Sequence, residues 1–253
     1  MNKETTKESL IPHPVLTDYY KDESAREKRI KRLFDDTAKH YDAINSVMSL
    51  GNGEKYRKEA LERAGLSKGQ FVLDIGCGTG VLARHEMDIV ESEGFVIGVD
   101  PSPGMLKEAV GRGVNRVALG RGESLPLLDN SVDFVSMGYA LRHVADLTAT
   151  FNEYYRALKP GGTLLLLEMA IPESRIRFLM LKAYMCYYVP FMARIRSGGY
   201  KESQVLMQYY WDTMVNFVPY QSILDSLEES GFKHVRRNVV HGIFGEFTAT
   251  KEA

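Results

Sequence analysis

The feature that most constrains the fold is an apolar run that leads directly into three glycines at alternate positions. The run Val72-Leu73-Asp74-Ile75 is followed by Gly76, Gly78 and Gly80. Glycines allow the backbone to turn sharply and let a ligand approach the carboxyl end of a strand. We expect a helix to begin near Val81, so the pattern predicts a strand, a ligand-binding loop and a helix in succession.

Two acids near this loop indicate what the ligand is. Asp100 ends the next apolar run, where a carboxylate can accept hydrogen bonds from both hydroxyls of a ribose. Asp74 precedes the glycines, at a place where it would repel a pyrophosphate but could hold a cationic amino group. A dinucleotide loop of the form G-x-G-x-x-G would also need glycine where Val81 stands. The sequence therefore predicts a nucleoside with a cationic amino-acid tail.

The rest of the chain predicts an α/β fold with a doubly wound, mostly parallel seven-stranded sheet. β-rich apolar runs alternate with helical stretches, which is typical of βαβ units. The last two runs, separated by a short connection, predict an antiparallel hairpin at the sheet edge. Residues 159–162, Lys-Pro-Gly-Gly, are expected to form a turn. The expected strands are 71–75, 95–99, 116–119, 132–137, 163–167, 234–240 and 245–250.

We expect four segments along the chain. Residues 1–60 form a leader and cap helices, with the first helix from about residue 24, and residues 61–172 form the cofactor-binding α/β core. Residues 173–218 form a helical cap, and residues 219–253 form the last helix and the hairpin of the core sheet.

Composition excludes several classes of protein. The 253 residues are 44% apolar and include 32 Lys and Arg and 33 Asp and Glu. This composition fits neither a disordered chain nor a basic nucleic-acid-binding protein. The two cysteines, Cys77 and Cys186, provide no disulfide framework and no multi-cysteine metal site, and we expect a site without metal. The polar N-terminus lacks the apolar core of a signal peptide, so we expect a cytoplasmic protein.

Further motifs carry a resemblance to a known family. From about Phe34 to Thr250 the chain resembles the class I S-adenosylmethionine-dependent methyltransferases, and more specifically the ubiquinone/menaquinone biosynthesis C-methyltransferases. Besides the glycine loop, the segments that carry the resemblance are Phe34, Tyr41-Asp42, Asn45 and Met48-Ser49; Leu125-Pro126, Asp129-Asn130-Ser131 and Asp133; Tyr139-Ala140-Leu141-Arg142-His143-Val144-Ala145-Asp146; and Leu158-Lys159-Pro160-Gly161-Gly162 with Glu168.

The resemblance implies S-adenosylmethionine as the cofactor and a set of residues around it. These are Tyr41, Asp74, Gly76, Gly78, Thr79, Gly80, Asp100, Arg121, Gly122, Glu123 and Gly138. Three positions depart from the family pattern: Arg121 replaces an acidic or amide side chain that accepts the adenine amino group, His143 replaces asparagine, and Tyr56 replaces tryptophan. Because arginine only donates, adenine must be held by the backbone around Gly122 and Glu123, or by the Glu123 side chain.

Three residues are candidates for the chemistry. Arg142 could stabilise a phenolate, which makes the carbon next to the oxygen nucleophilic. His143 could act as a general base, and Tyr139 could flank the acceptor ring or the sulfonium, as Tyr41 could. In the alternative interpretation, Arg142 only pairs with Asp146 across one helical turn, His143 is a packed histidine and Tyr41 belongs to the core.

The leading hypothesis is C-methylation of a polyprenylated quinol or phenol ring, a small lipophilic aromatic substrate. The alternatives are an O- or N-methyltransferase of another hydrophobic acceptor, a non-catalytic methyltransferase-fold protein and, less favoured because of Val81, an NAD-linked oxidoreductase. Residues 174–201 hold six cations and no acids around an apolar stretch. This predicts a helical cap that also contacts a membrane surface, and the alternative is a cap that only packs over the substrate crevice or against a second subunit of a homodimer. No nucleic-acid partner is expected.

Overall fold

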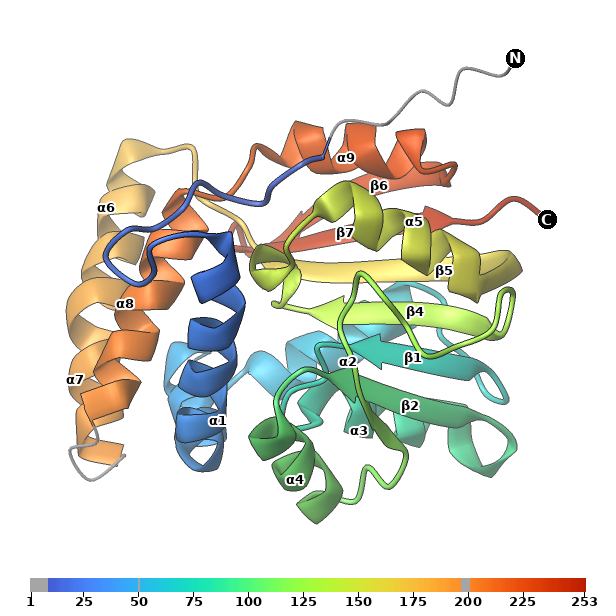
Figure 1. The fold of residues 1–253 in the computed structure, drawn as a ribbon, viewed down its shortest axis with the longest axis horizontal. Helices are drawn as coiled ribbons and strands as arrows, with labels where there is room; N and C mark the ends of the chain where they lie inside the picture. Colours follow the sequence, from blue (N-terminus) through green and yellow to red (C-terminus); the bar gives the residue numbers. More distant parts are fainter. Residues whose placement is uncertain (1–8, 50, 197–200) are drawn as a thin grey trace.

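The computed structural model describes residues 9–49, 51–196 and 201–253. Its centre is a seven-stranded sheet in the order β3-β2-β1-β4-β5-β7-β6 (Figure 1). The strands β1 to β5 are parallel, and β7 is antiparallel to both of its neighbours. This confirms the mixed sheet with a terminal hairpin. The bounds are β1 (Phe71–Ile75), β2 (Phe95–Asp100), β3 (Val117–Leu119), β4 (Val132–Gly138), β5 (Leu158–Met169), β6 (Lys233–Val240) and β7 (Phe244–Thr250).

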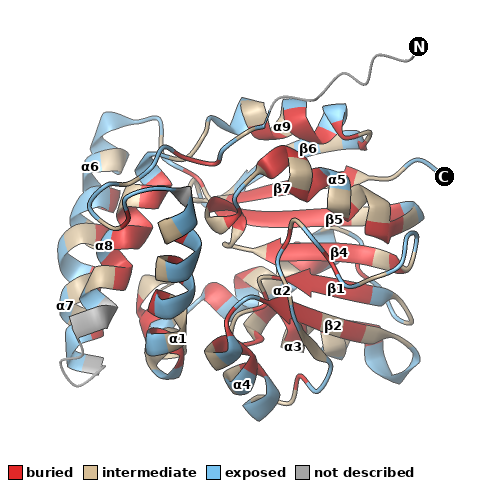
Figure 2. Cartoon of the chain, in the orientation of Figure 1, coloured by how far each residue is buried: buried red, intermediate tan, exposed pale blue. Residues whose placement is uncertain are grey.

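Helices cover both faces of this sheet because neighbouring strand residues point to opposite sides. On one face, Leu73 and Val135 pack with α5 (Leu147–Ala157) and α9 (Tyr220–Glu229). On the other face, Val72 and Phe134 pack with α2 (Gly53–Arg63), α3 (Val81–Val90) and α4 (Pro103–Gly111). Two short 3-10 turns, η1 (Glu91–Glu93) and η2 (Leu141–His143), complete this part. The central strands are accordingly buried along most of their length (Figure 2).

A third layer of helices stands beyond the carboxyl ends of the parallel strands, at the left in Figure 1. It consists of α1 (Glu23–Met48), α6 (Arg175–Ala183), the π-helical turn η3 (Tyr184–Tyr188), α7 (Val189–Arg196) and α8 (Lys201–Val215). These helices share a hydrophobic cluster of their own, which includes Leu33, Ile44, Met185, Leu206 and Trp211. Helices from the two ends of the chain therefore pack into one cap over the strand ends. No helix in the described ranges is both long and apolar enough to cross a membrane.

The turn expected at residues 159–162 is wrong, because these residues lie inside β5. The strand already pairs at Leu158 with Val132 of β4, and its register shifts before Thr163 pairs with Phe134. Gly161 has φ +79° and donates its N–H to the Lys251 carbonyl at 2.9 Å. Proline and glycine here make an irregularity within a long strand rather than an end to it.

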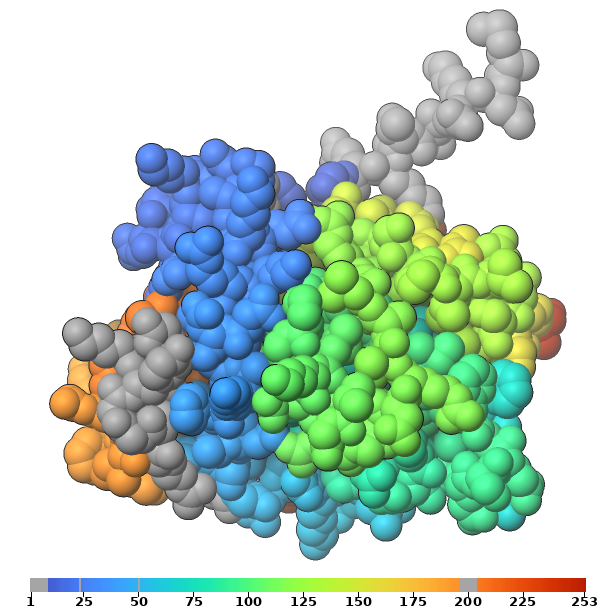
Figure 3. Space-filling model, turned by 60° about the horizontal axis from the view of Figure 1, so that its bottom comes forward, coloured from blue at the N-terminus to red at the C-terminus, as the bar shows by residue number. Residues whose placement is uncertain are grey.

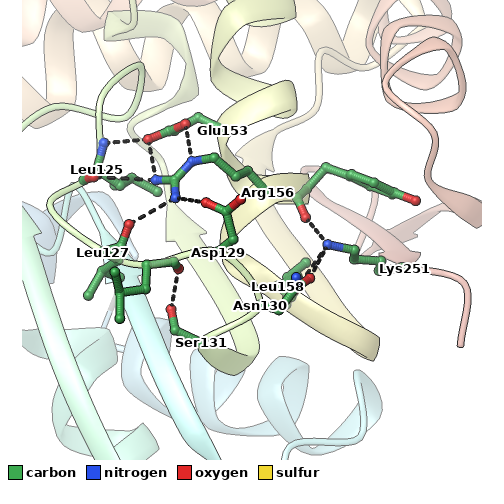
Figure 4. A network of polar contacts seen from close by, with 11 residues as sticks. Leu125, Leu127, Asp129, Asn130, Ser131, Glu153, Arg156, Leu158 and Lys251 are labelled. Carbon is green, nitrogen blue, oxygen red and sulfur yellow. Dashed lines mark hydrogen bonds and ion pairs between the residues drawn. The ribbon is translucent and has the colours of Figure 1, made fainter.

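Polar contacts fix the loop that leads into β4 (Figure 4). Arg156 of α5 pairs with Asp129 at 2.6 Å and with Glu153 at 2.7 Å, and its guanidinium donates to the Leu127 carbonyl at 2.8 Å. Glu153 in turn accepts the Leu125 N–H at 2.8 Å. The helix therefore holds this loop against the sheet.

Candidate active site

Two adjoining cavities lie at the carboxyl ends of the strands. The larger has a volume of about 410 Å³ and the smaller about 90 Å³. Both are lined by Tyr41, Gly76, Gly78, Gly138 and Tyr139. Because these residues form the boundary between the cavities, a single ligand can extend from one into the other.

Asp100 at the tip of β2 lines the larger cavity. Its two carboxylate oxygens accept the Gly78 N–H at 2.9 Å and the Ser102 N–H at 2.8 Å. Burial raises the pKa of Asp100 to about 6. Each carboxylate oxygen retains acceptor capacity, so the fixed side chain can still accept hydrogen bonds from two hydroxyl groups.

Asp74 on β1 is fully buried and lines the smaller cavity. Neither of its oxygens has a hydrogen-bond partner within the described chain. Burial raises the pKa of the Asp74 carboxyl well above its usual range, and the nearby carboxylates of Glu86 and Asp100 add to this effect. A buried carboxyl without a partner is costly, so this position fits the cationic amino group of a ligand.

The three loop glycines have different roles. Gly76 and Gly78 line both cavities with φ +63° and +55°, and a Cβ on Gly76 would lie 2.6 Å from the Ala140 Cβ. Gly80 lines neither cavity; a Cβ there would lie 2.8 Å from Val114. Gly80, expected at the cofactor, therefore lets the start of α3 lie close to Val114 and to Ala109 of α4, whereas Gly76 and Gly78 shape the ligand-binding surface.

Helix α1 lines the larger cavity, as the expected cap helices and Tyr41 suggested, but its polar contacts with the ligand-binding loops were not expected. Asp35 accepts hydrogen bonds from the Ser102 hydroxyl at 2.5 Å and from the Gly104 N–H at 2.9 Å. Asp42 accepts the Thr79 hydroxyl at 2.6 Å and also pairs with Arg112. Figure 3 shows α1, in blue, lying against the green segment that contains α4.

Arg121 also joins α1 to the wall of the larger cavity. Its guanidinium pairs with Glu27 of α1 at 2.6 Å, and its side chain is 45% exposed although the residue lines the larger cavity. The Glu123 carboxylate accepts the Ala145 N–H, and Gly122 is packed so tightly that a Cβ would lie 2.7 Å from the Tyr154 hydroxyl. Gly122 and Glu123 also line the larger cavity, so adenine recognition there stays a prediction.

Aromatic rings surround the smaller cavity. Tyr210 of α8 donates its hydroxyl hydrogen to Tyr41 at 2.9 Å and so joins the two helices. Tyr139 has φ +61°, a strained conformation for a residue with a side chain, and the Arg57 guanidinium lies 5.1 Å from its ring centre. Sequence reasoning missed Arg57, although its neighbour Tyr56 in α2 is one of the positions that depart from the family pattern. Other lining residues are Asn45, Met48, Thr79, Met169 and Phe244.

Arg142 and His143 are neighbours in η2 but line different cavities, Arg142 the smaller and His143 the larger. Arg142 is buried and forms an ion pair with Glu168 of β5. The alternative pairing with Asp146 is wrong: Asp146 caps α5 and accepts the Thr148 N–H at 2.8 Å. The guanidinium is therefore positioned by a carboxylate from the adjacent strand.

His143 lies between aromatic rings. It stacks on Tyr209 and Tyr210 with centroid distances of 5.4 and 6.1 Å, and its Nδ1 shares a hydrogen bond of 3.2 Å with the Tyr209 hydroxyl. Burial and the Arg142 charge hold the pKa of His143 well below its usual range. The ring is therefore neutral at physiological pH, and its role as a general base stays a prediction.

The comparisons with known proteins agree with this geometry. Residues 22–251 match the model of the ubiE/COQ5 methyltransferase family. The chain belongs to this family. A demethylmenaquinone methyltransferase of Symbiobacterium thermophilum is 37% identical over 82% of this chain and 86% of its own length. Another of the same name, from Anoxybacillus flavithermus, is 34% identical over 85% and 91%.

Solved structures show the same fold. Haemonchus contortus phosphoethanolamine N-methyltransferase 2, in complex with S-adenosyl-L-methionine, matches with a TM-score of 0.61 at 20% identity, over 87% of this chain and 57% of that one. This ubiE/COQ5-family member is an S-adenosylmethionine-dependent methyltransferase. The residues present fit the cofactor, since Asp74 would hold its ammonium group and Asp100 its ribose hydroxyls.

The methyltransferase also contains a buried thiol in the smaller cavity and a second buried acid near Asp74. Cys77 lines the smaller cavity, and burial raises the pKa of its thiol, so it is not a thiolate nucleophile. Within the described ranges, no group of three or more His, Cys, Asp or Glu residues could hold a metal ion.

Glu86 of α3 is fully buried and accepts the Ser136 hydroxyl at 2.5 Å, while its other carboxylate oxygen has no hydrogen-bond partner in the described chain.

Replacing Glu86 with glutamine is expected to stabilise the cofactor-free protein at alkaline pH. Burial raises the pKa of Glu86 to about 8. An acid whose pKa is raised on folding contributes full stability below its unfolded pKa, and this stability is lost as pH rises through the folded value. At pH 9 the free energy of unfolding of the variant should be higher than that of the wild type by about 1–3 kcal/mol. This gain is smaller than the pKa shift alone would give, because the variant buries an amide group, and this burial itself costs free energy.

Urea unfolding of both proteins at pH 5 and pH 9 measures this difference. The two should have nearly equal stability at pH 5. A change in unfolding free energy that is the same at both pH values would show that Glu86 is not the titrating group.

Proposed function

We propose that this methyltransferase transfers the methyl group to a ring carbon of a prenylated quinol that binds in the smaller cavity. The observation that carries the proposal is the lining of that cavity. Aromatic and methionine side chains form its walls, namely Tyr41, Met48, Tyr139, Met169, Tyr210 and Phe244, and the buried Arg142–Glu168 pair lies at its edge. The names of the relatives, demethylmenaquinone methyltransferases, support an acceptor of this class.

When bound, the cofactor supplies an electrophilic methyl group, and the protein must make the acceptor carbon electron-rich. Ionisation of a quinol hydroxyl raises the electron density on the adjacent ring carbon, which would bond to the methyl group as the methyl–sulfur bond breaks and then lose its own proton to restore aromaticity. Arg142 can stabilise the resulting oxyanion through its Nε, which is buried and has no hydrogen-bond partner in the described chain. Glu168 positions the guanidinium through Nη1 and balances its charge, so that the site is not strongly cationic before substrate binds.

The cap around the cavity keeps water away from the acceptor. The Tyr210–Tyr41 hydrogen bond joins α8 to α1 on one side, and Phe244 and Met169 close the side formed by the sheet. A dry, aromatic environment strengthens the contact between Arg142 and the oxyanion and favours a flat ring.

Purified protein with S-adenosylmethionine and a prenylated naphthoquinol that lacks one ring methyl group tests this function. We expect a product heavier by one methylene unit when the acceptor is reduced, and no product when it is oxidised, because a quinone has no hydroxyl to ionise. Absence of product from the quinol, or equal turnover of the quinone, would contradict the proposal. Mass spectrometry of the extracted lipid measures both.

We also propose that the enzyme works in the cytoplasm, at the membrane surface that holds such an acceptor. Cys77 and Cys186 are both unpaired, as is usual for thiols in a reducing compartment.

A further inference from the structure

The helical segment formed by α6, η3 and α7 has one buried side and one apolar exposed side. Leu181, Met185, Val189 and Ala193 are buried against the cap. On the other side Ile176 and Tyr187 are each 73% exposed, Met180 is 67% exposed and Phe191 is 63% exposed. We call the exposed set the outer face; it consists of Ile176, Leu179, Met180, Tyr187, Tyr188, Phe191 and Ile195.

This concentration of apolar side chains is unusual for a protein surface. Single exposed apolar residues are normal, whereas a contiguous group marks a surface that binds another apolar surface. The segment lies at the left edge of the molecule in Figure 1, and its inner side contacts α1 and α8. Nothing in the described chain covers the outer face, so its partner is another molecule.

The charges beside the outer face indicate the nature of that partner. Four cations, Arg175, Arg177, Lys182 and Arg194, are exposed on the same segment, and no acid occurs between Ser174 and Ile195, in a chain of net charge −1. Residues 197–200 and the side chains of Arg196 and Lys201, also counted among the cations of 174–201, lie outside the described residues. Basic side chains beside an apolar helix face complement a lipid surface, which has anionic head groups over a layer of hydrocarbon chains.

We propose that the outer face docks the enzyme on an anionic phospholipid surface. A second copy of the chain fits less well, because a two-fold interface would bring two identical basic faces together. Apolar side chains such as Phe191 and Met180 would enter the boundary between head groups and acyl chains, and Arg175, Lys182 and Arg194 would contact the lipid phosphates.

The same segment is connected to the smaller cavity. The Tyr184 hydroxyl of η3 donates to the Val47 carbonyl at 2.7 Å, and the adjacent Met48 lines that cavity. Phe178 of α6 contacts Trp211 of α8 with ring centroids 5.8 Å apart, next to Tyr210 in the cavity wall. If the acceptor is prenylated, as proposed above, docking brings the lipid that holds its tail close to the site; this part rests on the proposed function, whereas the docking itself does not.

Co-sedimentation with vesicles tests the docking. The protein should pellet with vesicles of phosphatidylglycerol and phosphatidylcholine, pellet much less with phosphatidylcholine alone, and be released by salt. Each cation near the surface changes the partition coefficient by about fivefold. R175E/R194E should therefore lower binding by at least that factor, and M180S/Y187S/F191S should lower it further.

Matched substitutions elsewhere serve as controls. K107E/K233E changes two exposed cations away from the outer face, and L128S removes an apolar side chain that is 81% exposed. Both should bind vesicles like the wild type. All variants should methylate a short-chain, water-soluble quinol at the wild-type rate, so that loss of docking is distinguishable from failure of the proposed function.

Two results would overturn the proposal. Wild-type protein that stays in the supernatant with anionic vesicles at low salt shows that the outer face does not bind lipid. The second result is a dimeric wild-type protein that does not bind vesicles, together with a monomeric M180S/Y187S/F191S variant. This result shows that the face is an interface between copies.

Discussion

Removal of the Arg142 guanidinium should lower kcat for methyl transfer by on the order of 100-fold, while the affinity for S-adenosylmethionine changes by less than about threefold. A group that stabilises the oxyanion acts mainly in the transition state. Arg142 has a buried Nε donor without a partner in the described chain, and it lines the smaller cavity together with Asp74 but not the larger cavity that Asp100 lines. The cofactor's ribose and ammonium groups are assigned to Asp100 and Asp74, so its binding should be little affected.

The choice of variant matters because Arg142 is paired. Arg142→Ala alone leaves the buried Glu168 carboxylate with the Met169 N–H as a donor but without its charged partner, which costs about 3–5 kcal/mol of stability. R142M/E168Q removes both charges at similar volume, and E168Q alone keeps the guanidinium. We expect the rate to fall strongly in R142M/E168Q and much less in E168Q. Equal losses in rate and cofactor affinity would assign Arg142 to cofactor binding or to structure.

Asp100→Ala should weaken S-adenosylmethionine binding between about tenfold and 100-fold. Hydrogen bonds to a carboxylate contribute about 1.5–3 kcal/mol each, and competition with water lowers the net value. The substitution also leaves the Gly78 and Ser102 N–H groups without the acceptor that they have in the structure. Asp100→Asn, which keeps the shape, should have a smaller effect.

Arg121→Ala is the matched comparison for Asp100, since both residues line the larger cavity. Its guanidinium pairs with Glu27 and is 45% exposed, so we expect a change in affinity below about threefold. Titration calorimetry with S-adenosylmethionine measures all three variants. Unchanged affinity in Asp100→Ala, or a larger loss in Arg121→Ala, would overturn the assignment of the ribose to the end of β2.

The elements that the sequence predicted well have local signals. Most strands were recognisable because apolar, β-branched runs end at acids or glycines within a few residues, whereas the first residues of β5 were expected to form a turn. The candidate nucleoside site could be proposed for the same reason, since Asp74, the glycine loop and Asp100 all lie at strand ends, and its residue assignments stay a prediction.

The contacts that could not be predicted join residues far apart in the sequence. Asp35 and Asp42 are two acids among many in a charged helix, and only the fold brings them to Ser102 and to Thr79. The alternative interpretation of Arg142 paired it with Asp146 across one helical turn, but η2 is a short 3-10 turn and Asp146 caps α5, so the guanidinium reaches Glu168 instead. Pairing between distant strands and helices decides such contacts, and no local pattern encodes them.

The central claim, methylation of a ring carbon, is tested most directly by the position of the transferred group. Purified protein would be given S-adenosylmethionine labelled with ¹³C in its methyl group, together with the prenylated naphthoquinol, and the extracted product examined by NMR. The account predicts a single labelled methyl bonded to an aromatic carbon next to a ring oxygen. A labelled methyl on oxygen would contradict the account and establish the O-methyltransferase alternative.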